Sequence, residues 1–130
     1  MKRKIIMTIV LTLSLLMMFF PWFGGAEGIQ EVYGLVLLKN PVSLTCILLI
    51  YIGIWTDCGK NSEVIGVIGF CGVLVMQIYE FLTWHILTIT GHFDLELSMR
   101  LSHKEFYIAL ACIVICLAIY RKIFIRYTDE

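Results

Sequence analysis

The stretch VIGVIGFCGVLVMQIYEFLTWHILTI, residues 64–89, is an apolar run of about 26 residues whose one carboxylate is Glu80. An α-helix rises about 1.5 Å per residue, so this run is long enough to cross the roughly 30 Å hydrocarbon core of a bilayer, with some length left for tilt or projection. The stretch therefore predicts a transmembrane helix, and the rest of the chain has to be compatible with a membrane setting.

The composition agrees with that setting. Hydrophobic residues make up 60% of the 130 residues and charged residues 15%, and the mean hydropathy is +0.91. A soluble domain of this size is closer to half apolar and a quarter charged, so this chain has too little polar surface to cover a water-soluble globule. The formal net charge is zero and gives no indication of a nucleic-acid partner.

Three further apolar segments predict three more spans. The first follows a basic cluster, Lys2-Arg3-Lys4, and closes with the interfacial aromatic pair Trp22-Phe23. The second opens at Asn40-Pro41, a good N-cap followed by a proline at the first helical position. The last opens at Ser102-x-x-Glu105, a capping box. The four predicted spans are about 5–23, 41–56, 64–89 and 104–120.

The first segment also fits a cleaved signal peptide. It has a basic start, an apolar stretch, and the small residues Gly24 and Ala26 before Glu27. The apolar run is long for a signal, and Trp22-Phe23 suits an anchor at the membrane surface better than a processing site. Cleavage would leave the other three spans in the same orientation.

The distribution of Lys and Arg predicts that both termini are cytoplasmic. Seven of the ten basic residues fall on the side of the termini and three on the other, and cytoplasmic loops are enriched in basic residues. The inner set is Lys2, Arg3, Lys4, Lys60, Arg121, Lys122 and Arg126; the outer set is Lys39, Arg100 and Lys104. The sequence thus predicts a multi-pass plasma-membrane protein with external loops at 24–40 and 90–103.

The external loops are expected to form a small β-sheet. Residues 93–101 alternate strictly between apolar and polar side chains, which is typical of a half-buried strand. The candidate partner strand is residues 32–37 of the first loop, which has β-type composition. The predicted fold is therefore an all-α membrane protein, a four-helix transmembrane bundle topped by an extracytoplasmic sheet built from the loops after the first and third spans.

This layout resembles that of claudins and, more closely, of small bacterial four-span membrane proteins with a claudin-like plan. The matching fragments are Pro21-Trp22, Gly34-Leu35 and Phe106-Tyr107; Val36 stands where claudins have a second Trp, and the first loop has no cysteine. The resemblance implies a layout and no assigned function, and the junctional role of claudins does not follow from it.

The third span carries the candidate functional residues. Gln77, Glu80 and Thr83 share one stripe with Gly66 and Gly69, so this face is expected to point into the bundle. Glu80 is either a proton or cation site or a structural carboxylate near the outer interface, hydrogen-bonded to another helix or loop. Gly66, Gly69 and Gly72 serve either internal helix packing or docking of another membrane protein, and Thr8 and Thr12 mark a second, weaker docking candidate.

Other reactive residues point to no chemistry. The five cysteines are expected to be free thiols, and Cys112 and Cys116 are too few for a metal site. His92, Asp94 and Glu96 would share the polar face of the predicted strand, but their spacing matches no ligand signature. No enzyme motif is present, so the sequence predicts no catalytic residue, no metal and no cofactor.

The sequence is best interpreted as a non-enzymatic membrane interaction or accessory protein, either a subunit of a complex or an immunity-type protein. Its expected partners are the lipid bilayer and either another membrane protein or a second copy of itself. The alternative is a small transporter or channel that works as an oligomer around Glu80, since four helices alone rarely enclose a pathway.

Overall fold

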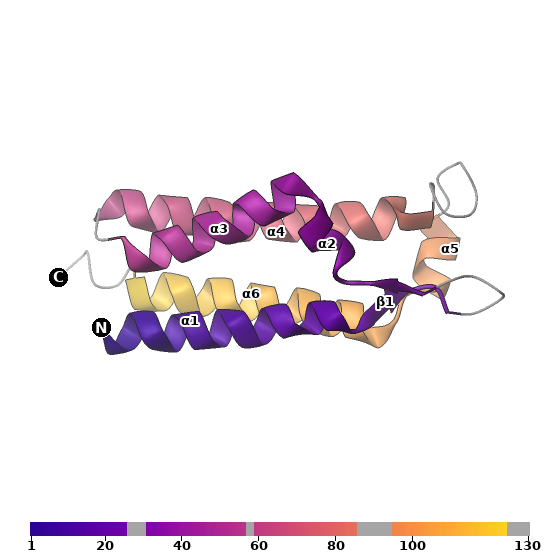
Figure 1. The fold of residues 1–130 in the computed structure, drawn as a ribbon, viewed down its shortest axis with the longest axis horizontal. Helices are drawn as coiled ribbons and strands as arrows, with labels where there is room; N and C mark the ends of the chain where they lie inside the picture. The colour runs from indigo at the N-terminus through magenta and orange to yellow at the C-terminus, as the bar shows by residue number, and fades with distance from the viewer. Residues whose placement is uncertain (26–30, 57–58, 86–94, 125–130) are drawn as a thin grey trace.

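The computed structural model describes residues 1–25, 31–56, 59–85 and 95–124, which form an elongated helical bundle (Figure 1). Helices α3 (Pro41–Trp55) and α4 (Lys60–His85) make one layer, and α1 (Lys2–Leu15) and α6 (Lys104–Phe124) make the other. The N-terminus, the start of α4 and the end of α6 lie together at what we name the basic end. The opposite end, the cap end, carries β1 (Pro21–Phe23), β2 (Val32–Tyr33) and α5 (Leu95–Arg100).

Among the described residues, two helices are long and apolar enough to cross a membrane. They are α4, over the 25 residues Lys60–Trp84, and α6, over the 20 residues Lys104–Ile123. Helix α3 is apolar but has 15 residues, and α1 has 14 before it continues as the four-residue 3₁₀ helix η1 (Leu16–Phe19). Helix is present where residues 41–56 and 104–120 predicted it. Helix α4 begins four residues before the predicted residue 64, and its predicted end at 86–89 lies outside the described residues.

The first helix ends earlier than the predicted residue 23, because of Pro21. Proline disfavours helical backbone at the residue before it, and Phe20 is extended, with φ −92° and ψ 152°. The helix therefore tightens into η1 and stops at Phe19. The indole Nε1 of Trp22 turns back and donates to the carbonyl oxygen of Met17 at 3.0 Å, which satisfies one of the backbone acceptors left at the helix end.

The small sheet differs from the predicted one. β1 pairs antiparallel with β2, so both of its strands come from the segment between α1 and α3. Residues 36–37, predicted to continue the second strand, begin the short helix α2 (Val36–Lys39) instead. The later segment touches the sheet through a single bridge between Phe23 and Ser102, with hydrogen bonds from Gly24 N to Leu101 O (3.0 Å) and from His103 N to Trp22 O (2.8 Å).

The predicted strand over 93–101 is wrong: Leu95–Arg100 is the helix α5, and residues 93–94 lie outside the described ones. Leu97 and Leu101 are buried one helical turn apart, while Leu95 and Met99 are 44% and 59% exposed. An alternating apolar pattern also contains i, i+4 pairs, and Leu, Glu, Met and Arg are good helix formers. A strand here would also need an edge of the sheet that offers more than one bridge.

The two predicted helix starts had different outcomes. Asn40 caps α3 as predicted, since its side-chain oxygen accepts from Val42 N at 3.0 Å and Pro41 occupies the first helical position. The prediction of a capping box at Ser102 is wrong. Helix α6 begins at Lys104, and the Ser102 hydroxyl donates to the carbonyl oxygen of Ser98 in α5. Ser102 therefore closes the preceding helix rather than opening the next one.

An aromatic cluster fills the cap end of the core. Trp22, Phe23 and Phe106 are almost completely buried, so the interpretation of Trp22-Phe23 as an anchor at the membrane surface is wrong. The Phe23 ring stacks on Trp84 with a centroid distance of 5.2 Å and packs on Phe106 at 5.1 Å. The Phe81 ring stacks on Phe106 at 5.4 Å and packs on Phe23 at 6.3 Å. These rings join β1, α4 and α6.

We expect Phe23→Ala to lower the free energy of unfolding by about 3 to 5 kcal/mol, because it removes a buried ring that packs against four other aromatic rings. Thermal unfolding in detergent, followed by circular dichroism, measures the change. Phe19→Ala is the matched control, since Phe19 is 60% exposed and its loss should change stability by less than about 0.5 kcal/mol. Equal losses in the two variants would contradict the cluster's role.

Candidate functional site

The polar residues of α4 lie at different depths. Gln77 is 1% exposed, and its carbonyl oxygen Oε1 has no hydrogen-bond partner. Glu80 and Thr83 are only partly buried, and the Thr83 hydroxyl donates to the carbonyl oxygen of Tyr79 in its own helix at 2.7 Å. Of the three polar residues singled out from the sequence, only Gln77 is enclosed in the core.

Ser43 on α3 is a second enclosed polar side chain, which the sequence reasoning missed. It is 0% exposed, and its hydroxyl oxygen also has no partner. The antiparallel register of the two helices sets Ile50 and Cys46 against Gly69, and Cys46 against Gly72. Ser43 lies three residues beyond Cys46 on α3, and Gln77 lies five residues beyond Gly72 on α4, so both are in the next part of the same helix–helix interface. The only sequence signal was the spacing of Ser43 from the buried apolar residues of α3, at 47, 50 and 54.

The side chains of Ser43 and Gln77 can each form hydrogen bonds but cannot act as an acid or a base. A serine hydroxyl and a carboxamide are both uncharged at physiological pH, so they can hold a polar group and have no acid or base function. Glu80, about one turn from Gln77, is the nearest carboxylate along α4. Leaving a buried acceptor without a partner costs about 1 to 3 kcal/mol, so Gln77 weakens the fold in the absence of a bound polar group.

The three glycines of α4 pack against the chain's own helices. A Cβ atom at Gly69 would lie 2.7 Å from the Cys46 carbonyl oxygen, and one at Gly72 would overlap the Cys46 sulfur. Gly66 faces Gly53 across the helix pair and also receives the Tyr120 ring from α6. These contacts are those of internal helix packing, and Gly66 and Gly69 are buried in them while Gly72 is partly exposed.

Several polar contacts between helices gather near the basic end. The Tyr120 hydroxyl of α6 donates to the Ser62 carbonyl oxygen of α4 at 2.8 Å. On the other side of the bundle, Trp55 Nε1 donates to the Thr8 hydroxyl at 3.0 Å. Thr12, the neighbouring docking candidate, lies 3.0 Å from the Tyr51 hydroxyl oxygen. Thr8 and Thr12 thus join α1 to α3, and no short-range pattern in the sequence could have paired residues about 40 positions apart.

No metal site is present in the described part of the chain, where no three histidine, cysteine or acidic residues gather. The cysteines described are free thiols, and Cys58 lies outside the described residues. Of the polar group at 92–96, only Glu96 is described, as an exposed residue of α5. His103 holds the cap end together, with Nε2 2.9 Å from the Gly24 carbonyl oxygen.

No family model matches this chain, and no curated protein or solved structure matches it. The resemblance to small claudin-like bacterial membrane proteins therefore stays a prediction. Function has to be inferred from the chemistry of the chain's own surface and core.

We expect Gln77→Leu to raise the free energy of unfolding by about 1 to 2 kcal/mol, because it replaces an unpartnered buried amide by an apolar side chain of similar size. Chemical or thermal unfolding of the purified protein in detergent measures the change. Thr45→Val is the control, since the Thr45 hydroxyl is exposed and already bonded within α3, to the Pro41 carbonyl oxygen. Destabilisation by Gln77→Leu would mean that Oε1 has a partner in the folded protein, contrary to this assignment.

Proposed function

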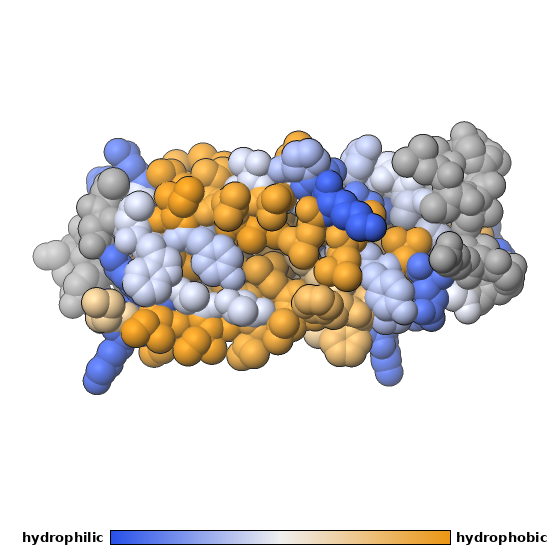
Figure 2. Space-filling view, in the orientation of Figure 1, coloured by the Kyte–Doolittle hydropathy of each residue, from blue (hydrophilic) through white to orange (hydrophobic). Residues whose placement is uncertain are grey.

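We propose that this protein is a non-enzymatic accessory protein of a plasma membrane, which crosses the bilayer four times and binds another integral membrane protein. The observation that carries the proposal is a belt of exposed apolar side chains around the middle of the bundle. Figure 2 shows one face of it, with hydrophilic residues mostly toward the two ends. An apolar surface of this extent is typical of contact with lipid or with other membrane proteins.

All four long helices contribute to this apolar belt. Side chains that are more than two-fifths exposed include Ile6, Ile9 and Leu13 of α1, Leu44, Leu48 and Ile52 of α3, Val64, Ile68 and Val75 of α4, and Ile108, Val114 and Ile115 of α6. If only α4 and α6 crossed the membrane, the apolar faces of α1 and α3 would be left in water. Their exposure supports four spans.

The lengths of the shorter helices are compatible with spanning. Helix α1 with η1 reaches about 29 Å, at 1.5 Å per α-helical and 2.0 Å per 3₁₀ residue, which is close to the hydrocarbon thickness. Helix α3 reaches about 22 Å, a deficit that local thinning of the bilayer accommodates. The excess of Lys and Arg at the basic end supports placing that end, and both termini, in the cytoplasm.

An accessory role fits the interior better than transport does. Among the described residues, the buried polar ones are Ser43, Ser62, Gln77 and Ser98, and none of them carries a charge. The aromatic cluster occupies the core at the cap end, where a pathway through a single copy would have to open. A large apolar exterior, around an interior whose described buried polar residues are uncharged, is suited to binding within the membrane, as a complex subunit or an immunity-type protein.

The alternative is a small transporter or channel built from several copies around Glu80. The partial burial of this carboxylate on a long apolar helix favours it, since ionisable groups in membrane helices often mark transport pathways. This alternative requires self-association, because Glu80 of one copy faces no polar pathway among the residues that the structure describes.

Cysteine labelling tests the four-span topology. In a variant without the native cysteines, a membrane-impermeant maleimide should label Glu96→Cys in intact cells, because Glu96 is exposed at the cap end. It should label Lys2→Cys and Asn61→Cys only after the membrane is opened, because both residues are exposed at the basic end. Labelling of Asn61→Cys in intact cells would overturn the orientation.

The assembly state and ion flux separate the two functions. We expect native-membrane extracts to contain the protein in a complex with a different membrane protein, and vesicles with the purified protein to show no pH-dependent ion flux. Glu80→Gln should then leave the mass of the complex unchanged. A homo-oligomer whose flux vanishes in Glu80→Gln, at unchanged thermal stability, would establish the transporter instead.

A further inference from the structure

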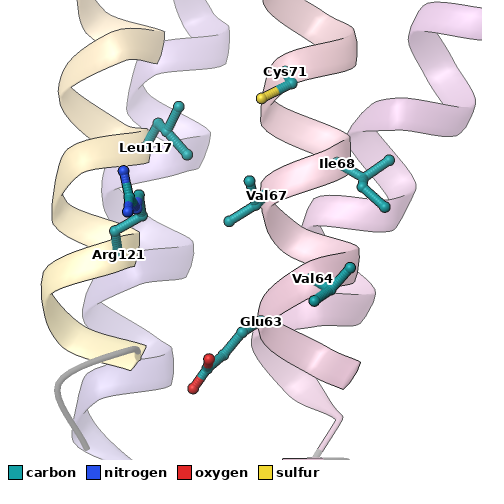
Figure 3. A pocket seen from close by; sticks show the side chains of 7 residues that line it. All are labelled: Glu63, Val64, Val67, Ile68, Cys71, Leu117 and Arg121. Atoms are coloured by element: carbon teal, nitrogen blue, oxygen red, sulfur yellow. The ribbon is translucent and has the colours of Figure 1, made fainter. Parts of the chain in front are cut away.

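A pocket lies between α4 and α6, near the basic end. Its volume is about 350 Å³ (Figure 3). One acid, one base and five less polar residues line it: Glu63, Val64, Val67, Ile68, Cys71, Leu117 and Arg121. Figure 3 shows Glu63 on the α4 wall and Arg121 on the α6 wall. We call this pocket the α4–α6 groove.

The two charges lie at the depth of a membrane surface. The hydrogen bond from the Tyr120 hydroxyl to the Ser62 carbonyl oxygen places the last turns of α6 level with the first turn of α4. Glu63 and Arg121 are the next residues in each helix, so both sit where the two apolar stretches end. Phospholipid headgroups lie at this depth when helices of this kind span a bilayer.

The groove opens toward the lipid and is closed toward the core. Tyr120 fills the space behind it, because its ring lies against Gly66 and 5.5 Å from the Phe70 ring. Val64 and Ile68 on the groove's rim are each 55% exposed. From Glu63 to Cys71 the α4 wall runs about 12 Å along the helix axis, into the apolar belt. An occupant therefore has to come from the membrane and to have an apolar part.

We propose that the α4–α6 groove binds one phospholipid whose headgroup carries both a phosphate and a primary ammonium, as in phosphatidylethanolamine. The Arg121 guanidinium binds the phosphate, for which its planar donor geometry is suited, and the Glu63 carboxylate accepts hydrogen bonds from the ammonium. The upper part of an acyl chain lies along Val67, Cys71 and Leu117. This inference deepens the proposed membrane function and rests on the chain residing in a bilayer.

Charge complementarity selects this headgroup over others. Acyl chains are all as apolar as the groove walls, so the apolar contact does not discriminate between lipids. An anionic headgroup without an ammonium would bring its negative charge beside Glu63. A quaternary ammonium, as in phosphatidylcholine, has no N–H group to donate to that carboxylate. The acid and the base on opposite walls of the groove therefore match a zwitterionic headgroup with a primary amine.

Native mass spectrometry of the purified full-length protein tests the proposal. The protein is mixed in detergent with phosphatidylethanolamine, phosphatidylcholine and phosphatidylglycerol of identical acyl chains, and bound lipid is counted. We expect phosphatidylethanolamine to be retained about tenfold more strongly than the other two, the size of effect that a charge-assisted hydrogen bond produces. Equal retention of the three lipids, or a preference for phosphatidylglycerol, would overturn the proposal.

Matched variants assign the effect to the groove. Arg121→Gln should reduce retention of all three lipids, and Glu63→Gln should abolish the preference for phosphatidylethanolamine over phosphatidylglycerol. Lys122→Gln is the control, because Lys122 is exposed and adjacent to Arg121 but does not line the groove. A loss in Lys122→Gln equal to that in Arg121→Gln would show non-specific attraction and overturn the site. Release of the native protein from membranes by alkaline carbonate would instead contradict the proposed membrane function.

Discussion

The close approach of α3 and α4 is the constraint on which the rest of the structure depends. A Cβ atom at Gly53 would lie 2.8 Å from the Gly66 Cα atom, so the two backbones meet at a distance that side chains would prevent. In lipid, helices gain no hydrophobic free energy by association and rely on such packing and on hydrogen bonds. Because Gly66 has no side chain, the Tyr120 ring also packs against it, and this contact connects α6 to α3 and α4.

The cap end is stabilised by aromatic packing, which depends on the position of one proline. Pro21 ends the first helix and turns the chain, so that Trp22 and Phe23 enter the core instead of continuing a helix toward the membrane surface. The Trp22 ring then packs on Gly34, where a Cβ atom would lie 2.5 Å from the indole ring. Backbone hydrogen bonds to residues 101 and 103 tie the start of α6 to the same strand. The molecule is thus closed at the cap end by aromatic packing and at the basic end by polar contacts.

With both ends closed in this way, the interior offers few groups for binding or acid–base chemistry, and the exterior offers more. The enclosed polar atoms of Ser43 and Gln77 are uncharged, and the glycines of α4 pack against α3 and Tyr120. The outer surface carries the apolar belt and the α4–α6 groove, which Glu63 and Arg121 line. The proposed role in binding lipid and other membrane proteins rests on that distribution.

The sequence by itself determined the long helices. Runs of apolar residues, the Asn40-Pro41 start and the glycine spacing of α4 act within a single helix and do not depend on its neighbours. It also determined which face of α4 turns inward, down to Gln77. Only the tertiary structure decided the secondary structure of the short segments and the burial of their side chains. The strict alternation over residues 93–101 predicted a strand, but residues 95–100 form the helix α5. β1 is already paired with β2, and its bridge to the later segment is made by Ser102, after α5 has ended. Likewise, the burial of Ser43, of Trp22 and of Phe23 depends on contacts between residues far apart in the chain, and so does the presence of Glu63 and Arg121 in one groove. No local periodicity encodes the register of such contacts.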